Sequence, residues 1–155
     1  MEAALFEKLS QLGLKLPETP KPVASYVPAV RTGNLVFVSG QLPLRDGILL
    51  ATGKVPTAVS LEAAQEAAGQ CVLNALAILL TQIDGDVSRL VRVVRLGVFV
   101  QTTDDFAEQH KVANGASDLL QQLFGEAGRH ARAAVGVNAL PLNAAVEVEA
   151  IFEVR

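Results

Sequence analysis

The last strand-like segment of the chain alternates between apolar and polar positions. Over residues 146–154 every second residue is apolar, and three of the four residues between them are glutamates, at Glu147, Glu149 and Glu153. Because successive side chains of a β-strand point to opposite faces, this alternation predicts a strand with one buried face and one acidic face.

A second apolar segment, residues 131–137, comes shortly before it and contains a single charged residue, Arg132. The sequence "NALPLN" at residues 138–143 separates the two segments and is typical of a turn. If this turn reverses the chain, the two strands are antiparallel neighbours. An unpaired guanidinium within an apolar strand costs free energy, so Arg132 is expected to pair either with one of the glutamates or with a ligand.

Helical and strand patterns alternate along the rest of the chain. Apolar residues recur at helical spacing in three segments, which run from Glu2 to Leu12, from Ser60 to about Asp84, and from Asp104 or Asp105 to Gly125. Strand-like segments lie at residues 34–40 and 91–102, and two short strands are joined by a turn at Asp46–Gly47. This order predicts an α+β fold in which helices cover one face of a mixed sheet, so the other face must meet another surface.

The length of 155 residues fits a single domain with one core. Within residues 1–155 we predict an N-terminal helix and a proline-rich connector at 1–22, followed by the core at 23–155. Half of the residues are hydrophobic, only 19% are charged, and the mean hydropathy is +0.35. Such an apolar composition indicates that part of the surface is buried against other subunits.

Charge and residue counts argue against several classes of protein. A net charge of −3 without a run of lysines or arginines argues against nucleic-acid binding. The single cysteine, Cys71, cannot form an intrachain disulfide and is expected in the core, and His110 and His130 do not form a cluster with the spacing of zinc ligands. The charged start of the chain and the lack of an apolar run of about 18 residues predict neither a signal peptide nor a membrane span, so a cytoplasmic location is expected.

Arginine and glutamate together suit the hydrolysis of a small substrate that carries a carboxylate. The planar guanidinium of Arg132 matches a carboxylate, and a nearby glutamate can hold and polarise a water molecule. A structural ion pair between the same residue types is the alternative, and spacing alone leaves both open. No other basic residue is placed in a site. Arg92 and Arg95, three apart in one strand, are expected on opposite faces, and both histidines are expected to be solvated or to cap helices.

Three segments together are similar to one known family. They read "SYVPAVRTGNLVFVSGQLP" at residues 25–43, "TGKV" at 52–55, and "ARAAVGVNALPLNAAVEVEAIF" at 131–152. The chain resembles the RidA family in these segments, also called YjgF-like proteins or reactive intermediate deaminases. The resemblance implies a chorismate-mutase-like α+β fold and a homotrimer with clefts between its subunits. Archetypal members hydrolyse enamines and imines, such as 2-aminoacrylate, to 2-keto acids and ammonia without a cofactor.

The resemblance also implies roles for five residues. Arg132 stands at the position of the family's carboxylate-binding arginine, Glu147 at that of its water-orienting glutamate, and Tyr26 and Ser39 at those of its substrate-contacting tyrosine and serine, with Gly40 after the serine. The implied mechanism has Arg132 anchor the carboxylate while Glu147 directs water to the imine carbon.

Two positions depart from the archetype. A cysteine common there is replaced by Ala134 and an acidic residue by Gly136, which indicates a smaller and less polar pocket without thiol chemistry. A non-catalytic trimeric binder or sensor of small carboxylates is therefore an alternative to a deaminase. A ribonuclease or translation inhibitor is disfavoured, because an acidic chain with no tryptophan and one tyrosine offers little for backbone binding or base stacking.

Overall fold

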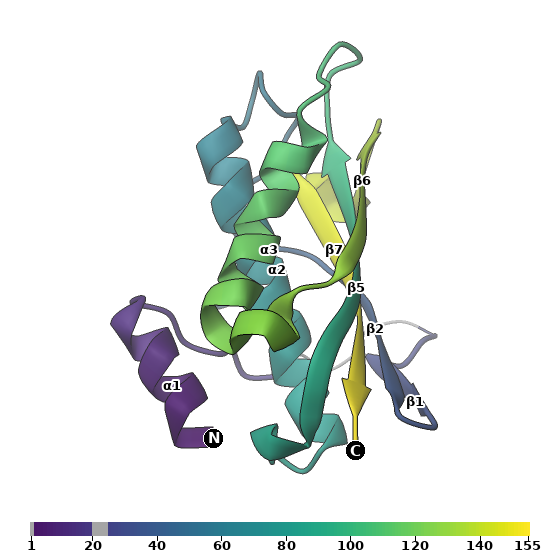
Figure 1. Cartoon of the computed structure of the whole chain (residues 1–155). Helices are drawn as coiled ribbons and strands as arrows, with labels where there is room; N and C mark the ends of the chain where they lie inside the picture. Colours follow the sequence, from purple (N-terminus) through teal and green to yellow (C-terminus); the bar gives the residue numbers. More distant parts are fainter. Residues whose placement is uncertain (1, 20–24) are drawn as a thin grey trace.

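A five-stranded mixed sheet carries a layer of helices on one of its faces (Figure 1). The computed structural model describes residues 2–19 and 25–155. The sheet contains, in spatial order, β1 (Ala29–Thr32), β2 (Leu35–Gln41), β7 (Val146–Val154), β5 (Leu90–Gln101) and β6 (Ala131–Val137). Neighbouring strands of this sheet run antiparallel, except for β5 and β6, which run parallel. The predicted α+β class is confirmed.

In the described part of the chain, three α-helices form the second layer. They are α1 (Glu2–Gln11), α2 (Leu61–Gln82) and α3 (Gln109–Phe124), and three short 3₁₀ turns are η1 (Val87–Arg89), η2 (Gly125–Gly128) and η3 (Pro141–Asn143). In Figure 1, α2 and α3 lie side by side along the sheet, and α1 lies at the outer side of this helical layer. Residues 20–24 of the predicted connector lie outside the described residues.

The central helix α2 begins and ends where its sequence predicts. The Ser60 hydroxyl accepts a hydrogen bond from the backbone N–H of Ala63 at 3.1 Å, which caps the first turn. By length and composition α2 could cross a membrane, but 72% of its most apolar 18-residue window is buried within the protein. That burial is what a core helix shows, because its neighbours cover it on most sides.

The alternating strand β7 has the predicted two faces. Its apolar face is buried under the helices, and its five members are Val146, Val148, Ala150, Phe152 and Val154. The opposite face of the sheet, which no helix of the described chain covers, is called the open face below. Val30, Phe37, Ile151 and Arg95 are aligned across it by the strand register.

The predicted hairpin near residue 46 is also present. Strands β3 (Leu44–Arg45) and β4 (Ile48–Leu49) pair antiparallel around Asp46 and Gly47. Both turn residues have positive φ angles, 52° and 78°, as a two-residue hairpin turn of this twist requires.

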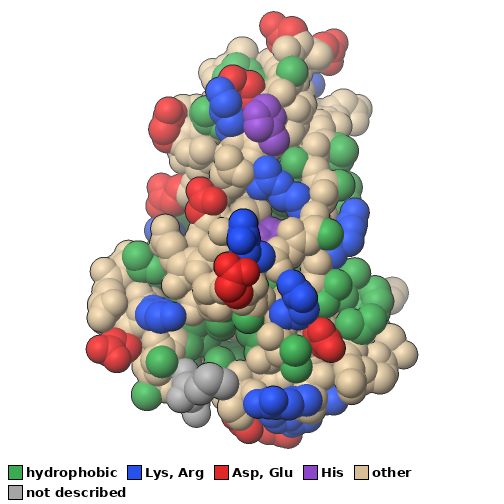
Figure 2. Space-filling view, in the orientation of Figure 1, with side chains coloured by type: hydrophobic (Ala, Val, Ile, Leu, Met, Phe, Trp, Pro, Cys, Tyr) green, Lys and Arg blue, Asp and Glu red, His purple; other side chains and the backbone are tan. Residues whose placement is uncertain are grey.

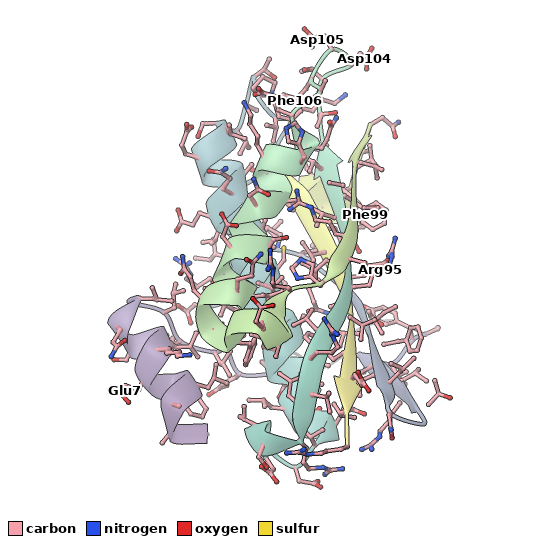
Figure 3. All side chains as sticks on the ribbon, viewed as in Figure 1. Glu7, Arg95, Phe99, Asp104, Asp105 and Phe106 are labelled. Atoms are coloured by element: carbon pink, nitrogen blue, oxygen red, sulfur yellow. The ribbon has the colours of Figure 1, made fainter. Side chains whose placement is uncertain are left out.

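The third helix begins later than the sequence predicts. Helix α3 starts at Gln109 and not at Asp104 or Asp105, although it ends at Gly125 as expected. The Thr103 hydroxyl donates to the carboxylate of Asp105 at 2.9 Å, and Phe106 N donates to the Thr103 carbonyl at 3.2 Å. Short polar side chains compete with helix formation in this way, so residues 103–108 form a loop. Figure 3 shows Asp104 and Asp105 at its exposed tip.

The prediction that the last two strands are antiparallel neighbours is wrong. Strand β5 lies between them and pairs with β6 on one side and with β7 on the other. The connection at residues 138–143 therefore passes over the end of β5, where the buried Gln101 side chain holds it. Gln101 accepts from Leu140 N at 2.7 Å and donates to the Asn143 side chain at 2.8 Å.

The prediction that Arg92 and Arg95 point to opposite faces is also wrong. Arg92 is in register with Glu153 and Arg95 with Ile151, which are two residues apart on the open face of β7. Strand β5 therefore contains an extra residue between them, a β-bulge that resets the alternation. Figure 3 shows Arg95 and Phe99 pointing away from the helices.

Candidate functional site

The sequence "SG" at the end of β2 forms a β-bulge beside β7. Val38 is in register with Ala150 and Gln41 with Val148, so β2 has one extra residue in this interval. The Ser39 hydroxyl donates to the carbonyl of Val27 at 2.8 Å. This bond ties the bulge to the loop that carries Tyr26, whose side chain is 54% exposed.

The carboxylate of Glu147 lies directly against Gly40. A Cβ atom at position 40 would overlap a carboxylate oxygen of Glu147 and would lie 2.9 Å from its Cδ. Glycine at this position therefore provides space for the glutamate, and the structure brings Ser39, Gly40 and Glu147 together at the start of the open face.

Glu147 has no hydrogen-bond or ion-pair partner among the described residues. Its side chain is half-buried, and that burial raises its pKa above the ordinary value, as does the nearby charge of Glu149 to a smaller extent. Glu149 itself forms an ion pair with Arg95 at 3.7 Å. Glu147 is thus a carboxylate whose proton affinity is increased and whose oxygens remain available to water or a ligand.

Arg132 lies on the other face of the sheet. It is in register with the buried Leu96 of β5, so its side chain points toward the helices. Its Nη1 donates to Asn114 Oδ1 at 2.8 Å and to Ser117 Oγ at 3.0 Å, and its Nη2 donates to the His110 carbonyl at 3.1 Å. All three acceptors belong to α3.

Arg132 forms no ion pair with a carboxylate within the described part of the chain. The structural alternative left open by the sequence, a pair between Arg132 and a glutamate of β7, is therefore absent. Three neutral oxygens orient the guanidinium without neutralising it, and two of its five N–H groups remain for another acceptor.

Within the chain the predicted site residues fall into two groups. Ser39, Gly40 and Glu147 lie together, and Tyr26 is on the loop bonded to Ser39. Arg132 is separate, on the helix side of the edge strand β6.

Two partners of Arg132 have no assigned role in the sequence analysis. Ser117 is 5% exposed, and its hydroxyl is 2.8 Å from Nε2 of His130, whose Nδ1 is 2.6 Å from the Gly128 carbonyl. The expectation that His130 is solvated is thus wrong, because its ring is half-buried, whereas its bond to the carbonyl of Gly128, the last residue of η2, is a capping contact of the expected kind. Asn114 and Ser117, three apart on one side of a helix whose buried side is otherwise mostly apolar, are the sequence signal that could have indicated a buried polar contact.

The two positions that depart from the archetype, Ala134 and Gly136, lie close to neighbouring side chains. Ala134 packs against the core, in register with Val98. A Cβ atom at Gly136 would lie 2.8 Å from Gln109 Nε2 and 2.9 Å from Thr102 Oγ1, so an acidic side chain does not fit without movement of both. Cys71 is fully buried, and that burial raises the pKa of its thiol.

Comparison with known proteins decides the family. Residues 17–154 match the sequence model of the family described as Endoribonuclease L-PSP, which includes the YjgF and RidA proteins. The chain belongs to this family. Protein TCP17 of Trypanosoma cruzi is 46% identical over 148 residues, which cover 95% of this chain and 92% of that protein.

Two further proteins are similar to this chain over most of its length. The 2-iminobutanoate/2-iminopropanoate deaminase of Dermatophagoides farinae is 29% identical over 142 residues, 92% of this chain and 95% of that one. The crystal structure of Atu1372 from Agrobacterium tumefaciens, a protein of unknown function, is 45% identical, has a TM-score of 0.94, and covers 99% of this chain with 94% of its own. The family resemblance predicted from three sequence segments is confirmed.

Proposed function

We propose that this protein is a cofactor-independent hydrolase that converts small 2-imino and enamine carboxylates into 2-keto acids and ammonia. The observation that carries the proposal is that two charged side chains have no oppositely charged neighbour. Among the described residues, Arg132 forms no ion pair with a carboxylate and Glu147 forms none with a cation. Charged groups held in this state suit an anionic substrate and a bound water. The deaminase relative supports the reaction class.

The two groups of site residues act together if they come from different subunits. Because Arg132 and Glu147 lie on opposite faces of one sheet, we propose that the edge strand β6 of one copy meets the open face of the next. The open face carries exposed apolar side chains that such an assembly would bury, including Val30 at 54% and Phe37 at 41% exposure. Figure 2 shows hydrophobic side chains gathered on the side of β1 and β2. A homotrimer closes such a repeating contact.

The proposed chemistry needs only protein side chains and water. The remaining N–H groups of Arg132 bind the substrate carboxylate. Glu147 takes a proton from water as the water oxygen attacks the imine carbon, and the carbon–nitrogen double bond becomes a single bond. That proton then passes to the nitrogen, which gives a carbinolamine. As the carbon–nitrogen bond breaks, Glu147 takes the proton of the new hydroxyl group and gives it to the departing nitrogen, so the keto acid and ammonia leave. An enamine first takes a proton at its β-carbon and loses one from its nitrogen, which gives the imine.

The test is hydrolysis of 2-iminopropanoate, generated in place by an amino-acid oxidase. Glu147→Gln should reduce kcat by about 100-fold, because an amide can hold a water but cannot take its proton. Glu153→Gln, on the same face of the same strand, is the matched control and should leave kcat unchanged. A wild-type protein that does not accelerate the hydrolysis would contradict the proposal.

A non-catalytic binder of small carboxylates is the second candidate. It is favoured by Ala134 and Gly136, where the archetype has a thiol and an acid, and by the side chains of Thr102 and Gln109, which leave little space for a larger side chain at position 136. Turnover separates the two candidates, because both should bind keto acids. For either one we propose a cytoplasmic location, where such metabolites arise.

A further inference from the structure

A chain of hydrogen bonds runs behind Arg132 into the protein. A backbone carbonyl can only accept, so Nδ1 of His130 donates to the Gly128 carbonyl at 2.6 Å. Nε2 of the neutral imidazole is then an acceptor, and the Ser117 hydroxyl, 2.8 Å away, donates to it. The Ser117 oxygen in turn accepts from Nη1 of Arg132 at 3.0 Å. In each of these three hydrogen bonds, only one of the two partners can therefore be the donor.

The surroundings of the chain favour this arrangement. Ser117 is buried, and burial lowers the pKa of His130 below its ordinary value, with the positive charge of Arg132 acting in the same direction. Neutral His130 keeps Nε2 as an acceptor at neutral pH. The hydroxyl hydrogen of Ser117 is therefore committed to the histidine, and the lone pairs of its oxygen face the guanidinium.

We infer that Ser117 and His130 are positioning residues that fix the guanidinium of Arg132 for a carboxylate ligand. The inference rests on the proposed function. Asn114 and the His110 carbonyl also accept from Arg132, but Asn114 is partly exposed and can reorient, whereas Ser117 is buried and held by His130. A guanidinium whose plane is fixed in advance loses less conformational entropy when it binds a carboxylate.

This role differs from a purely structural one in what it changes. Loss of the hydrogen bonds between Arg132, Ser117 and His130 does not affect Glu147, the proposed base, which lies on the other face of the sheet. Capture of the substrate should therefore weaken, while the chemical step at saturating substrate should be preserved. A change in KM without a matching change in kcat is the signature.

The first experiment compares Ser117→Ala with the wild-type protein in hydrolysis of 2-iminopropanoate and in calorimetric binding of pyruvate. Ser117→Ala should raise KM and the pyruvate Kd about tenfold or more, the value of one hydrogen bond to a charged group. The kcat should stay within about twofold. Equal falls in kcat and kcat/KM, or an unchanged KM and Kd, would overturn the inference.

Two substitutions of His130 form a matched pair. His130→Gln can place a side-chain oxygen near the site of Nε2 and so accept from Ser117, whereas His130→Asn is too short and keeps only the contact with the Gly128 carbonyl. His130→Gln should retain most of the pyruvate affinity and His130→Asn should lose it to the extent seen for Ser117→Ala. Equal affinities in the two variants would contradict the role of His130, even if Ser117→Ala fails to fold.

Arg132→Lys separates this inference from the proposed function. If Arg132→Lys binds pyruvate as the wild type does, Arg132 is not the carboxylate anchor and the proposed function fails at that residue. If Arg132→Lys weakens binding while Ser117→Ala and His130→Asn bind normally, the proposed function stands and the positioning role is refuted.

Discussion

The space above Gly40 determines where the carboxylate of Glu147 can lie. A Cβ there would overlap that carboxylate, and the neighbouring pair, Gly97 and Glu149, has the same arrangement, with a Cβ at position 97 falling 2.6 Å from a Glu149 oxygen. Two glycines, on the two strands that flank β7, thus make room for two of its glutamates. In the proposed mechanism only Glu147 acts on water. The effect of moving this glutamate can therefore be separated from the effect of adding a methyl group to the sheet.

Gly40→Ala should move the Glu147 carboxylate and reduce kcat for imine hydrolysis by about tenfold or more, since small misplacement of a catalytic group is costly. Gly97→Ala adds the same methyl group beside Glu149 and is the matched control. Thermal unfolding should show similar destabilisation of both variants. Comparable losses of kcat in both would indicate that the effect of Gly40→Ala is general strain and not displacement of a base.

The raised pKa of Glu147 predicts a pH dependence. A general base must be ionised, so kcat/KM should fall as pH decreases through a pKa above the ordinary glutamate value. Burial is the main cause and the charge of Glu149 the second, so Glu149→Gln should move this acidic limb to lower pH without abolishing it. A limb that stays in place in Glu149→Gln, measured over the same pH series, would assign it to another group.

The raised pKa of Glu147 also predicts how the stability of the fold depends on pH. A carboxyl whose pKa is higher in the folded state binds its proton more tightly there than in the unfolded chain. Its contribution to stability is therefore present at low pH and is lost as pH rises through the raised pKa. Glu147 lowers the stability of the folded chain in the pH range where it would be active, which is common for functional groups.

At the scale of elements, α2 and α3 cross with very little space between them. A Cβ at Gly115 of α3 would overlap the Gln65 carbonyl and lie 2.7 Å from Gln65 Cα, whereas a Cβ at Gly69 of α2 would lie 3.5 Å from the Gly115 carbonyl, an ordinary contact. The backbone of α2 therefore leaves no space for a methyl group at position 115, whereas a methyl group at position 69 fits. The crossing also places Asn114 and Ser117 beside Arg132.

Gly115→Ala should therefore lower the free energy of unfolding by about 2 kcal/mol or more, because the helices must separate. Gly69→Ala is the control at the same crossing and should be neutral or stabilising by about 1 kcal/mol, as alanine favours a helix. Chemical denaturation of both variants provides the comparison. Equal stabilities would show that the crossing relaxes freely.

The elements themselves could be predicted because their signals are local. The alternation of β7, the Ser60 cap and the turn at Asp46–Gly47 each depend on neighbouring residues. The order of the strands could not be predicted from the same signals, because β5 is apolar enough to pair on both edges and nothing local shows that it separates β6 from β7. The bulge before Arg95 likewise depends on pairing with β7.

The candidate site, like the fold, could be predicted from the sequence only in part. Arg132 and Glu147 could be found from sequence because each is a charged residue in an apolar strand and matches a family position. Their placement on opposite faces could not be found, since it follows from strand order and register. Ser117 and His130 were missed because their bond joins α3 to the segment before β6, thirteen residues apart in sequence.

At the scale of the whole molecule, the open face should hold the subunits together. Phe37 on β2 is 41% exposed on that face, and Phe6 on α1 is 45% exposed elsewhere. Phe37→Glu should place a charge in the proposed contact and shift the protein from trimer toward monomer in sedimentation experiments, while Phe6→Glu should leave the trimer intact. A wild-type protein that sediments as a stable monomer at micromolar concentration would exclude the assembly.

Mixing two inactive variants tests whether each site contains residues of two subunits. In Arg132→Lys every cleft lacks the anchor, and in Glu147→Gln every cleft lacks the base. If Arg132 of one copy faces Glu147 of the next, a mixed trimer contains clefts where an intact arginine from the Glu147→Gln subunit meets an intact glutamate from the Arg132→Lys subunit. Random mixing in equal amounts places both intact residues in about a quarter of the clefts. Refolding the two variants together should thus restore about a quarter of the wild-type kcat per cleft, whereas the same variants refolded separately and then combined should stay inactive. Recovery cannot occur if one subunit supplies both residues, because every subunit in the mixture carries one substitution.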